Sequence, residues 1–286
     1  MNSVLVTGGT GSFGAAFILR LLDEQLADRI CVYSRGEHSQ ALLRLAMDDD
    51  SRLRWFIGDV RDRDRLTRAM QGCDTVIHAA ALKRIEVGQS NPSEMVKTNI
   101  VGTMNVIEAA IDAGVERGVY LSSDKAYQPI SPYGQSKALA ESLIFSANLL
   151  HGCRWSITRY GNVAGSRGSV IPKWRNVLNA GLDTVSVTDP DCTRFWMLMS
   201  EAIDLVLRAV DAEPGALLIP TLPAYRLGDL AEVMGLKTLT TGLPPFEKKH
   251  ESMRDGLCSQ DAYRMSVEEL REALKGVHSM TTGTID

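Results

Sequence analysis

The chain has 286 residues, of which 44% are hydrophobic and 23% are charged, and its formal net charge is −4. This mildly acidic balance argues against a nucleic-acid partner, which usually needs a basic face. The five cysteines are dispersed without a C-x-x-C pair, and no leader or run of ~18 apolar residues occurs, so we expect a cytoplasmic protein without disulfide, metal site or membrane span.

The first predicted element is a strand over residues 3–7 that runs directly into a glycine-rich turn at 8–14, with a helix at 15–22. Such a turn lets the backbone approach a pyrophosphate, and the helix N-terminus offers free N–H groups to it. A glycine-rich turn without a ligand is the alternative, but the position between a strand and a helix favours a dinucleotide site. The expected cofactor contacts here are Gly8, Thr10, Gly11, Ser12, Phe13 and Gly14.

The second predicted strand, at 29–33, ends in Ser34 and Arg35. An NAD-preferring site places Asp or Glu at this strand end to accept from the ribose 2′-hydroxyl, whereas arginine can meet a 2′-phosphate. We therefore predict NADP with Ser34 and Arg35 as contacts, although Glu37 lies nearby and a solvated surface arginine is the alternative.

Two further strands, at 54–58 and 73–78, repeat this strand-to-helix form. The first leads into an acid that would reach the adenine, and the second leads into small residues against which a flat cofactor can lie. A helix is predicted over 92–113. The expected cofactor contacts on these segments are Asp59, Val60, Ala79, Ala80, Ala81 and Asn99.

The strand at 119–123 delivers Asp124 and Lys125 to its carboxyl end, the edge at which ligands bind in open α/β sheets. Tyr133 and Lys137 follow at i and i+4, so they share one face of a helix. An acid, a base and a Tyr/Lys pair this close together predict a proton-transfer centre. A surface Asp–Lys pair in a loop is the alternative for the first two residues.

Regular alternation of strands and helices predicts an α/β doubly wound parallel sheet of the Rossmann type with a smaller C-terminal substrate lobe. We assign 1–165 to the dinucleotide-binding domain, with 189–214 packing back on it. Residues 166–188 and 215–286 are assigned to the lobe. Because the last third of the chain looks too small for a core of its own, we expect the lobe to pack on the sheet domain with the active site between them.

With these motifs in place, the chain resembles the extended short-chain dehydrogenase/reductases, and more narrowly the inverting UDP-N-acetylglucosamine 4,6-dehydratases. The narrowest matching segments are Ser-Ser-Asp-Lys-Ala at 122–126 and Thr-Arg-Phe-Trp at 193–196. The resemblance extends from residue 7 to residue 251, and its other segments lie at 7–14, 34–35, 78–83, 133–137, 159–163, 165–172 and 247–251.

The resemblance implies an NADP-dependent lyase that oxidises C4 transiently, eliminates water across C5 and C6 and returns the hydride to C6, with inversion at C5. Tyr133, its pKa lowered by Lys137 and the nicotinamide charge, would take the C4 hydroxyl proton. Lys125 stands where retaining relatives have a glutamate, so it would be the C5 base, with Asp124 as the acid at the C6 hydroxyl. A lysine base must be neutral, and we expect Lys137 and oxidised nicotinamide to push its pKa well below ~10.4.

The resemblance also implies UDP-N-acetylglucosamine as the substrate and a homo-oligomer. Arginine's planar fork suits pyrophosphate oxygens, although an ordinary ion pair with Asp189 or Asp191 is the alternative for Arg194. His78 is interpreted as a packing residue. The expected substrate-binding residues are Lys83, Asn162, Arg167, Arg194 and Glu247.

Two other functions stay open. A nucleotide-sugar epimerase or NADPH-dependent ketoreductase on the same scaffold would use Tyr133 and Lys137 but would not need Asp124 and Lys125. A non-catalytic NADP-sensing protein is the remoter alternative, and it would have no use for the Tyr/Lys pair.

Overall fold

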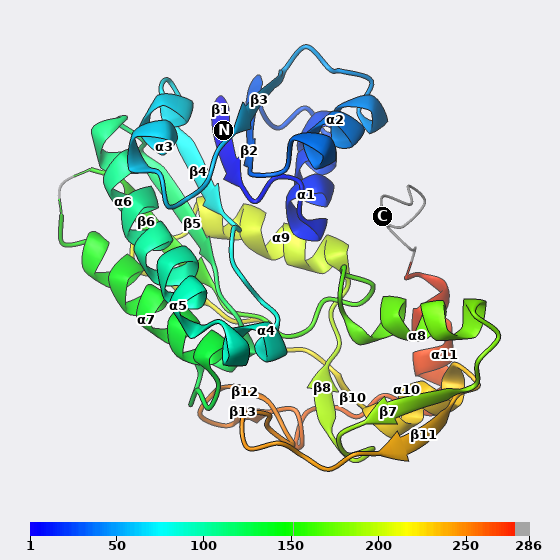
Figure 1. Cartoon of the computed structure of the whole chain (residues 1–286). Coiled ribbons are helices and arrows are strands. Elements are labelled where there is room, and N and C mark those ends of the chain that lie inside the picture. The colour runs from blue at the N-terminus through cyan, green and yellow to red at the C-terminus, as the bar shows by residue number, and fades with distance from the viewer. Residues whose placement is uncertain (151, 278–286) are drawn as a thin grey trace.

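The computed structural model describes residues 1–150 and 152–277, and its centre is a seven-stranded parallel sheet (Figure 1). The strand order is β3-β2-β1-β4-β5-β6-β9, so the direction of winding reverses between β1 and β4, where ligands bind in such sheets. The predicted doubly wound fold is confirmed. The strands are β1 (Ser3–Thr7), β2 (Arg29–Ser34), β3 (Leu53–Ile57), β4 (Thr75–His78), β5 (Arg117–Leu121), β6 (Arg154–Thr158) and β9 (Leu217–Leu218).

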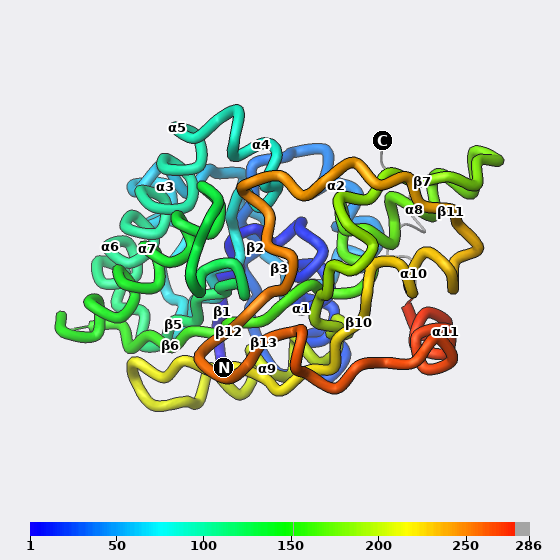
Figure 2. The backbone as a smooth tube through the Cα atoms, turned by 90° about the horizontal axis from the view of Figure 1, so that it is seen from below, coloured from blue at the N-terminus to red at the C-terminus, as the bar shows by residue number. Residues whose placement is uncertain are grey.

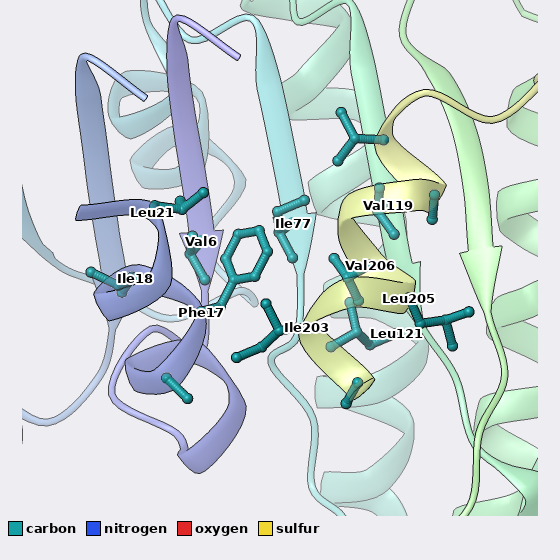
Figure 3. Packing of buried hydrophobic residues seen from close by; sticks show 14 of the residues in the cluster. Val6, Phe17, Ile18, Leu21, Ile77, Val119, Leu121, Ile203, Leu205 and Val206 are labelled. Carbon is teal, nitrogen blue, oxygen red and sulfur yellow. The ribbon is translucent and has the colours of Figure 1, made fainter. Parts of the chain in front are cut away.

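Helices cover both faces of this sheet because alternate strand residues are buried on opposite sides. On one face, Phe17 of α1 (Ser12–Asp23) and Ile203 of α9 (Met199–Val210) pack with Val6 and Ile77 (Figure 3). On the other face, a second apolar cluster includes Leu5 of β1. Its helices are α3 (Arg63–Met70), α6 (Gly102–Asp112) and α7 (Pro132–Ala147).

The helix predicted over 92–113 is one continuous helical run with an irregular middle. It consists of α5 (Pro92–Met95), the π-helical turn η1 (Val96–Val101) and α6. Inserted π-turns are rare and often occur near functional sites. The remaining helical segments of this half are α2 (Glu37–Ala46), α4 (Ile85–Ser90) and the 3₁₀ turn η2 (Asp124–Ala126).

The smaller lobe lies beside the sheet domain and contains short two-stranded pairs flanked by helices (Figures 1 and 2). Strand β7 pairs in parallel with β11, β8 pairs antiparallel with β10, and β12 pairs antiparallel with β13. The lobe elements are α8 (Val170–Asn179), β7 (Thr184–Val187), β8 (Thr193–Phe195), β10 (Ala224–Arg226), α10 (Leu227–Val233), β11 (Lys237–Thr240), β12 (Ser252–Arg254), β13 (Leu257–Cys258) and α11 (Val267–Lys275).

The lobe has a buried apolar cluster of its own, which corrects the expectation that it is too small for one. Trp174 and Val185 precede α9 in the chain, whereas Tyr225, Leu230 and Leu270 follow it, and all five belong to this cluster. A core therefore forms because two stretches that are separated in sequence combine their apolar residues.

The chain crosses between the two halves more than once. Helix α9, within 189–214, packs on the sheet, and β9 pairs with β6. Residues 217–218, which we assigned to the lobe, are thus the edge strand of the central sheet. The rest of the division into two lobes stays our proposal, and residues 278–286 of the assigned lobe lie outside the described residues. Within the described ranges, no helix is both long enough and apolar enough to span a bilayer.

Candidate active site

A cleft of about 870 Å³ lies at the carboxyl ends of the central strands, facing the smaller lobe. Its walls come from the glycine turn, the ends of β2 to β6, and lobe residues such as Arg194 and Glu247. All of the predicted site residues except Asn99 and Asp124 line it. The sequence prediction therefore converges on one cavity.

The glycine turn is shaped so that only glycine fits at two of its positions. Gly8 has a φ of +67°, and a Cβ there would lie 3.0 Å from the backbone of Ala80. A Cβ on Gly14 would overlap the carbonyl oxygen of Gly8, which accepts from the N–H of Gly11 (2.8 Å). Helix α1 begins at Ser12 without a side-chain cap, so its first N–H groups stay free for an anion.

The end of β2 presents serine and arginine to the cleft. The Arg35 side chain is 58% exposed, and its nearest acid is Asp59 at 3.9 Å, which already pairs with Arg61 at 2.7 Å. Ser34 is buried and its Oγ accepts from Gln40 Nε2 (3.0 Å). The Arg35 guanidinium is therefore available to a ligand at this edge.

Asn99 does not line the cleft. Its Nδ2 donates to the carbonyl oxygen of Leu82 (2.9 Å) and to Ser136 Oγ (2.9 Å), and its Oδ1 accepts from the N–H of Leu82 (2.8 Å). The π-turn η1 thus ties the loop after β4 to helix α7. Asn99 is therefore buried and engaged by protein groups, and its assignment as a direct cofactor contact stays a prediction.

His78 is buried with both ring nitrogens in hydrogen-bond contact, as the packing interpretation predicts. Nδ1 lies 2.8 Å from Thr7 Oγ1, and Nε2 lies 3.1 Å from Thr103 Oγ1. Burial, with a contribution from Lys137, lowers the pKa of His78 to about 3, so the ring is neutral. A neutral, fully engaged imidazole has no free group for catalysis.

The predicted proton-transfer residues meet where β5 ends against the first turn of α7. Ser123 caps η2, and Ser131 caps α7 by accepting from the N–H of Gly134 (3.1 Å). Proline at the first helical position of α7 is pre-set for that turn. Tyr133 and Lys137 are both buried on the face of α7 that borders the cleft.

Lys125 is held between carboxylates, contrary to expectation. Its Nζ lies 3.1 Å from Asp124 Oδ1, 3.1 Å from Glu251 Oε1 and 3.3 Å from Asn162 Oδ1. Burial acts to lower the pKa of Lys125, but the two carboxylates outweigh it and raise the pKa above its ordinary value. The expectation of a depressed pKa is wrong for this state, in which Lys125 is an ammonium.

Asp124 is suited to the role of an acid. It is 1% exposed, its Oδ1 accepts from Ser123 Oγ (2.9 Å), and its Oδ2 has no hydrogen-bond partner among the described residues. Burial raises the pKa of Asp124 despite the neighbouring Lys125. The protonated carboxyl is therefore favoured relative to an exposed aspartate.

Tyr133 and Lys137 are perturbed mainly by burial. Burial raises the pKa of Tyr133, and the groups that act against it are Lys125 and Ser123. Lys137 is not among the main groups that act on this pKa, and a lowering by Lys137 together with the nicotinamide charge stays a prediction. Lys137 Nζ donates to the carbonyl oxygen of Leu121 and lies 4.1 Å from the Tyr120 ring centroid, and burial lowers its pKa to about 7.

The predicted substrate residues divide between two places in the cleft. The Arg194 guanidinium pairs with Glu247 at 2.7 Å, and not with Asp189 or Asp191 as in the alternative interpretation. The side chain and backbone of Arg167 hydrogen-bond to the glycine turn, with its N–H 2.9 Å from Ser12 Oγ. Arg167 thus reaches over the cofactor turn.

Glu251 is the main cleft residue that the sequence interpretation missed. It is 2% exposed, lines the cleft and contacts Lys125. The Glu-Lys-Lys-His-Glu segment at 247–251 was recognised, but only its first glutamate was selected. The segment itself is recognisable in the sequence, but the contact of Glu251 with Lys125 depends on how the lobe packs against the sheet domain.

Comparisons with known proteins agree with this geometry. Residues 4–268 match the family model described as polysaccharide biosynthesis protein. The inverting UDP-N-acetylglucosamine 4,6-dehydratase of Campylobacter jejuni is 39% identical over 258 residues, which cover 88% of this chain and 77% of that protein. The UDP-glucose 4-epimerase of Rickettsia prowazekii is 38% identical over 265 residues, with the same coverage.

Solved structures share the fold. The Pen protein of Bacillus thuringiensis aligns with a TM-score of 0.91 at 35% identity, over 96% of this chain and 98% of that one. The dTDP-glucose 4,6-dehydratase DesIV of Streptomyces venezuelae, solved with NAD and TYD bound, aligns with a TM-score of 0.84 at 22% identity, over 98% of each chain.

Proposed function

The chain belongs to the polysaccharide biosynthesis protein family, and from this premise we propose that it is a UDP-N-acetylglucosamine 4,6-dehydratase that inverts C5. The observation that carries the proposal is the ion pair between the buried Asp124 and Lys125 (3.1 Å), with Lys125 and Tyr133 both lining one cleft. A 4-epimerase needs redox chemistry at C4 alone and expels no hydroxyl. The dehydratase and epimerase relatives have similar sequence identities to this chain, so identity does not distinguish the two functions. We therefore base the choice on Asp124 and Lys125.

In the redox half of the reaction, Tyr133 removes the proton of the C4 hydroxyl. A nicotinamide dinucleotide held by the glycine turn would supply the acceptor for the C4 hydride and its donor to C6. Lys125 and Ser123 favour the phenolate form of Tyr133, and Lys137 adds positive charge beside it when protonated. The glycine turn holds the pyrophosphate through the free N–H groups of α1.

In the elimination half, the 4-ketone acidifies the C5–H bond. Lys125 removes this proton as an amine, and the protonated Asp124 donates to the C6 oxygen, which leaves as water. Arg194 and Arg167 bind the diphosphate of the nucleotide, with Asn162 and Lys83 close to the sugar. All of these residues except Asp124 line the same cleft, and Asp124 reaches it through its contact with Lys125.

For the cofactor, the fold relatives support a nicotinamide dinucleotide, and we propose NADP. Ser34 and Arg35 support it, because the strand end that faces the cleft offers a guanidinium and no carboxylate. The DesIV structure contains NAD, but at 22% identity it does not decide between NAD and NADP for this chain. Replacing Arg35 with alanine should weaken NADP binding about tenfold or more and leave NAD binding nearly unchanged, as measured by cofactor titration. Equal losses for both cofactors would contradict NADP.

The reaction itself is tested by incubating the enzyme with UDP-N-acetylglucosamine in D₂O. The expected product has lost one water, carries deuterium at C5 and forms without net change in the cofactor. An epimerase would yield an isomer of unchanged mass, and a ketoreductase would consume NADPH. NMR and mass spectrometry distinguish these outcomes.

Two variants assign the residues. Lys125→Met should keep cofactor binding and stop C5 exchange, and undiminished exchange would remove Lys125 from its role. Tyr133→Phe should abolish turnover, which a non-catalytic NADP-sensing protein could not show. Light scattering on the purified protein tests the homo-oligomer that the family resemblance implies.

A further inference from the structure

We propose that Glu251 positions Lys125 and accepts its ammonium proton, thereby generating the amine that deprotonates C5. The proposal rests on the dehydratase function and adds to it a residue from the far end of the chain. It answers a chemical question raised by the site: Lys125 lies between two carboxylates as an ammonium, and an ammonium cannot act as a base.

Glu251 has the geometry for a direct proton transfer. Its Oε1 lies 3.1 Å from Lys125 Nζ, and the carboxylate is 2% exposed at the wall of the cleft. Its Oε2 has no hydrogen-bond partner among the described residues, and Lys248 Nζ lies 3.8 Å from it. One oxygen therefore contacts the lysine, and the other is free to carry charge or a proton.

The backbone of Glu251 is fixed on the lobe, so the carboxylate stays in place. Its N–H donates to Ser259 Oγ (2.9 Å), and its carbonyl oxygen accepts from the N–H of Ser259 (2.7 Å). Ser259 Oγ lies 2.7 Å from Thr193 Oγ1, and the N–H of Thr193 donates to the carbonyl oxygen of Lys249 (3.0 Å). These bonds join the segment before β12 to β8.

The surrounding charges give the two carboxylates different tasks. Burial acts to raise the pKa of Glu251, but Lys125, Arg194 and Lys248 together hold it below its ordinary value. Burial raises the pKa of Asp124. Burial thus favours the protonated form of Asp124, whereas the neighbouring cations favour the ionised form of Glu251, so Glu251 is the better placed of the two to hold Lys125 and to take up its proton during the elimination.

The proton balance closes over the elimination. An N–H bond of Lys125 breaks and an O–H bond forms on Glu251. The C5–H bond then breaks, its proton goes to Lys125, and its electron pair forms the C5–C6 double bond as the C6–O bond breaks. Asp124 gives its proton to the departing oxygen, and water leaves. Transfer of the proton from Glu251 through Lys125 to Asp124 restores the starting state.

The test replaces Glu251 with glutamine, which can still accept a hydrogen bond from Lys125 but cannot take its proton. On addition of UDP-N-acetylglucosamine, the reduced nicotinamide absorbance should still appear, because oxidation at C4 does not need Glu251. Deuterium exchange at C5 and loss of water should fall about 100-fold or more. Glu251→Asp, which keeps the carboxyl, should recover part of this loss and covers the case in which the glutamine variant does not fold.

Asp189→Asn is the matched control. Asp189 forms an ion pair (2.8 Å) with Lys249, which lies two residues before Glu251, but Asp189 does not line the cleft. Loss of this ion pair should therefore leave the rate of C5 exchange within about twofold of wild type. C5 exchange within threefold of wild type in Glu251→Gln would overturn the proposal, as would loss of C4 oxidation together with exchange. A wild-type enzyme that does not dehydrate UDP-N-acetylglucosamine would refute the proposed function instead.

Discussion

Replacing Lys137 with methionine should stabilise the protein while abolishing its turnover. Lys137 is 3% exposed, and burial lowers its pKa from 10.5 to about 7. Burial in the fold therefore disfavours the charged form of Lys137, although the proposed reaction needs Lys137 beside Tyr133. Methionine has a similar length and no charge, so it fills the same space without the desolvation cost.

The size of the effect follows from this pKa difference. A change from 10.5 to about 7 corresponds to roughly 5 kcal/mol of unfolding free energy below pH 7, where the unfolded lysine is charged. The variant leaves the carbonyl oxygen of Leu121 without its donor, which offsets about 1–3 kcal/mol. The net gain is about 2–4 kcal/mol, equivalent to a rise in Tm of roughly 4–8 °C.

The gain should depend on pH in a defined direction. Between about pH 7 and 10.5 the unfolded lysine keeps a proton that the folded lysine has lost, so the stability of the wild type rises with pH. The variant lacks this contribution. Its advantage is therefore largest below about pH 7 and disappears as the pH approaches 10.5.

Thermal unfolding followed by circular dichroism checks this at about pH 6 and about pH 9, on protein freed of bound dinucleotide, since a ligand would add its own stabilisation. Tyr133→Phe is the control, because it removes a buried polar group on the same helix face without removing a charge. A Lys137→Met variant with no higher Tm at the lower pH, or with equal gains at both, would refute the reasoning.

Three further substitutions test the supports of the site. Gly134→Ala would place a Cβ against the carbonyl oxygen of Lys125, and the resulting shift of the backbone should lower kcat about tenfold or more while the affinity for the dinucleotide stays unchanged. An unaffected kcat would show that the turn can accommodate the Cβ. Glu141→Gln should cost about 3–5 kcal/mol in urea unfolding, because it leaves Arg159 buried without its ionic partner; a loss below about 1 kcal/mol would contradict this. Phe17→Ala should cost about 3–5 kcal/mol in the same assay with little change in KM, and a selective rise in KM would argue against a purely packing role.

The parts of the site that could be predicted are those that lie close together in the chain. Asp124 and Lys125 follow a strand, and Tyr133 and Lys137 occupy one face of the next helix, so strand-end and helix-period rules locate all four. The glycine turn is similarly local. The doubly wound parallel sheet follows from the regular alternation of strands and helices up to β6, although its strand order was not predicted.

The parts that could not be predicted depend on contacts between distant segments. The pKa of Lys125 is raised by Asp124, which is next to it in the chain, and also by Glu251, which comes from the lobe. An expectation that counted only the neighbouring cations therefore had the wrong sign. Asn99 lies in a recognisable motif, but its burial under the loop after β4 depends on packing against α7. The core of the lobe was missed because its apolar residues come from two stretches of the chain, one before and one after α9. Neither stretch has enough apolar residues to form a core alone.

The order of the site segments along the chain has a consequence for how the protein acquires activity during synthesis. The glycine turn and strands β1 to β6 are complete by residue 158, the edge strand β9 adds at 217–218, and Glu251 follows later still. A growing chain therefore assembles its dinucleotide turn and Tyr133 before the carboxylate beside Lys125 exists. Premature termination between β9 and residue 251 would leave every strand of the central sheet in place and remove the proposed proton acceptor.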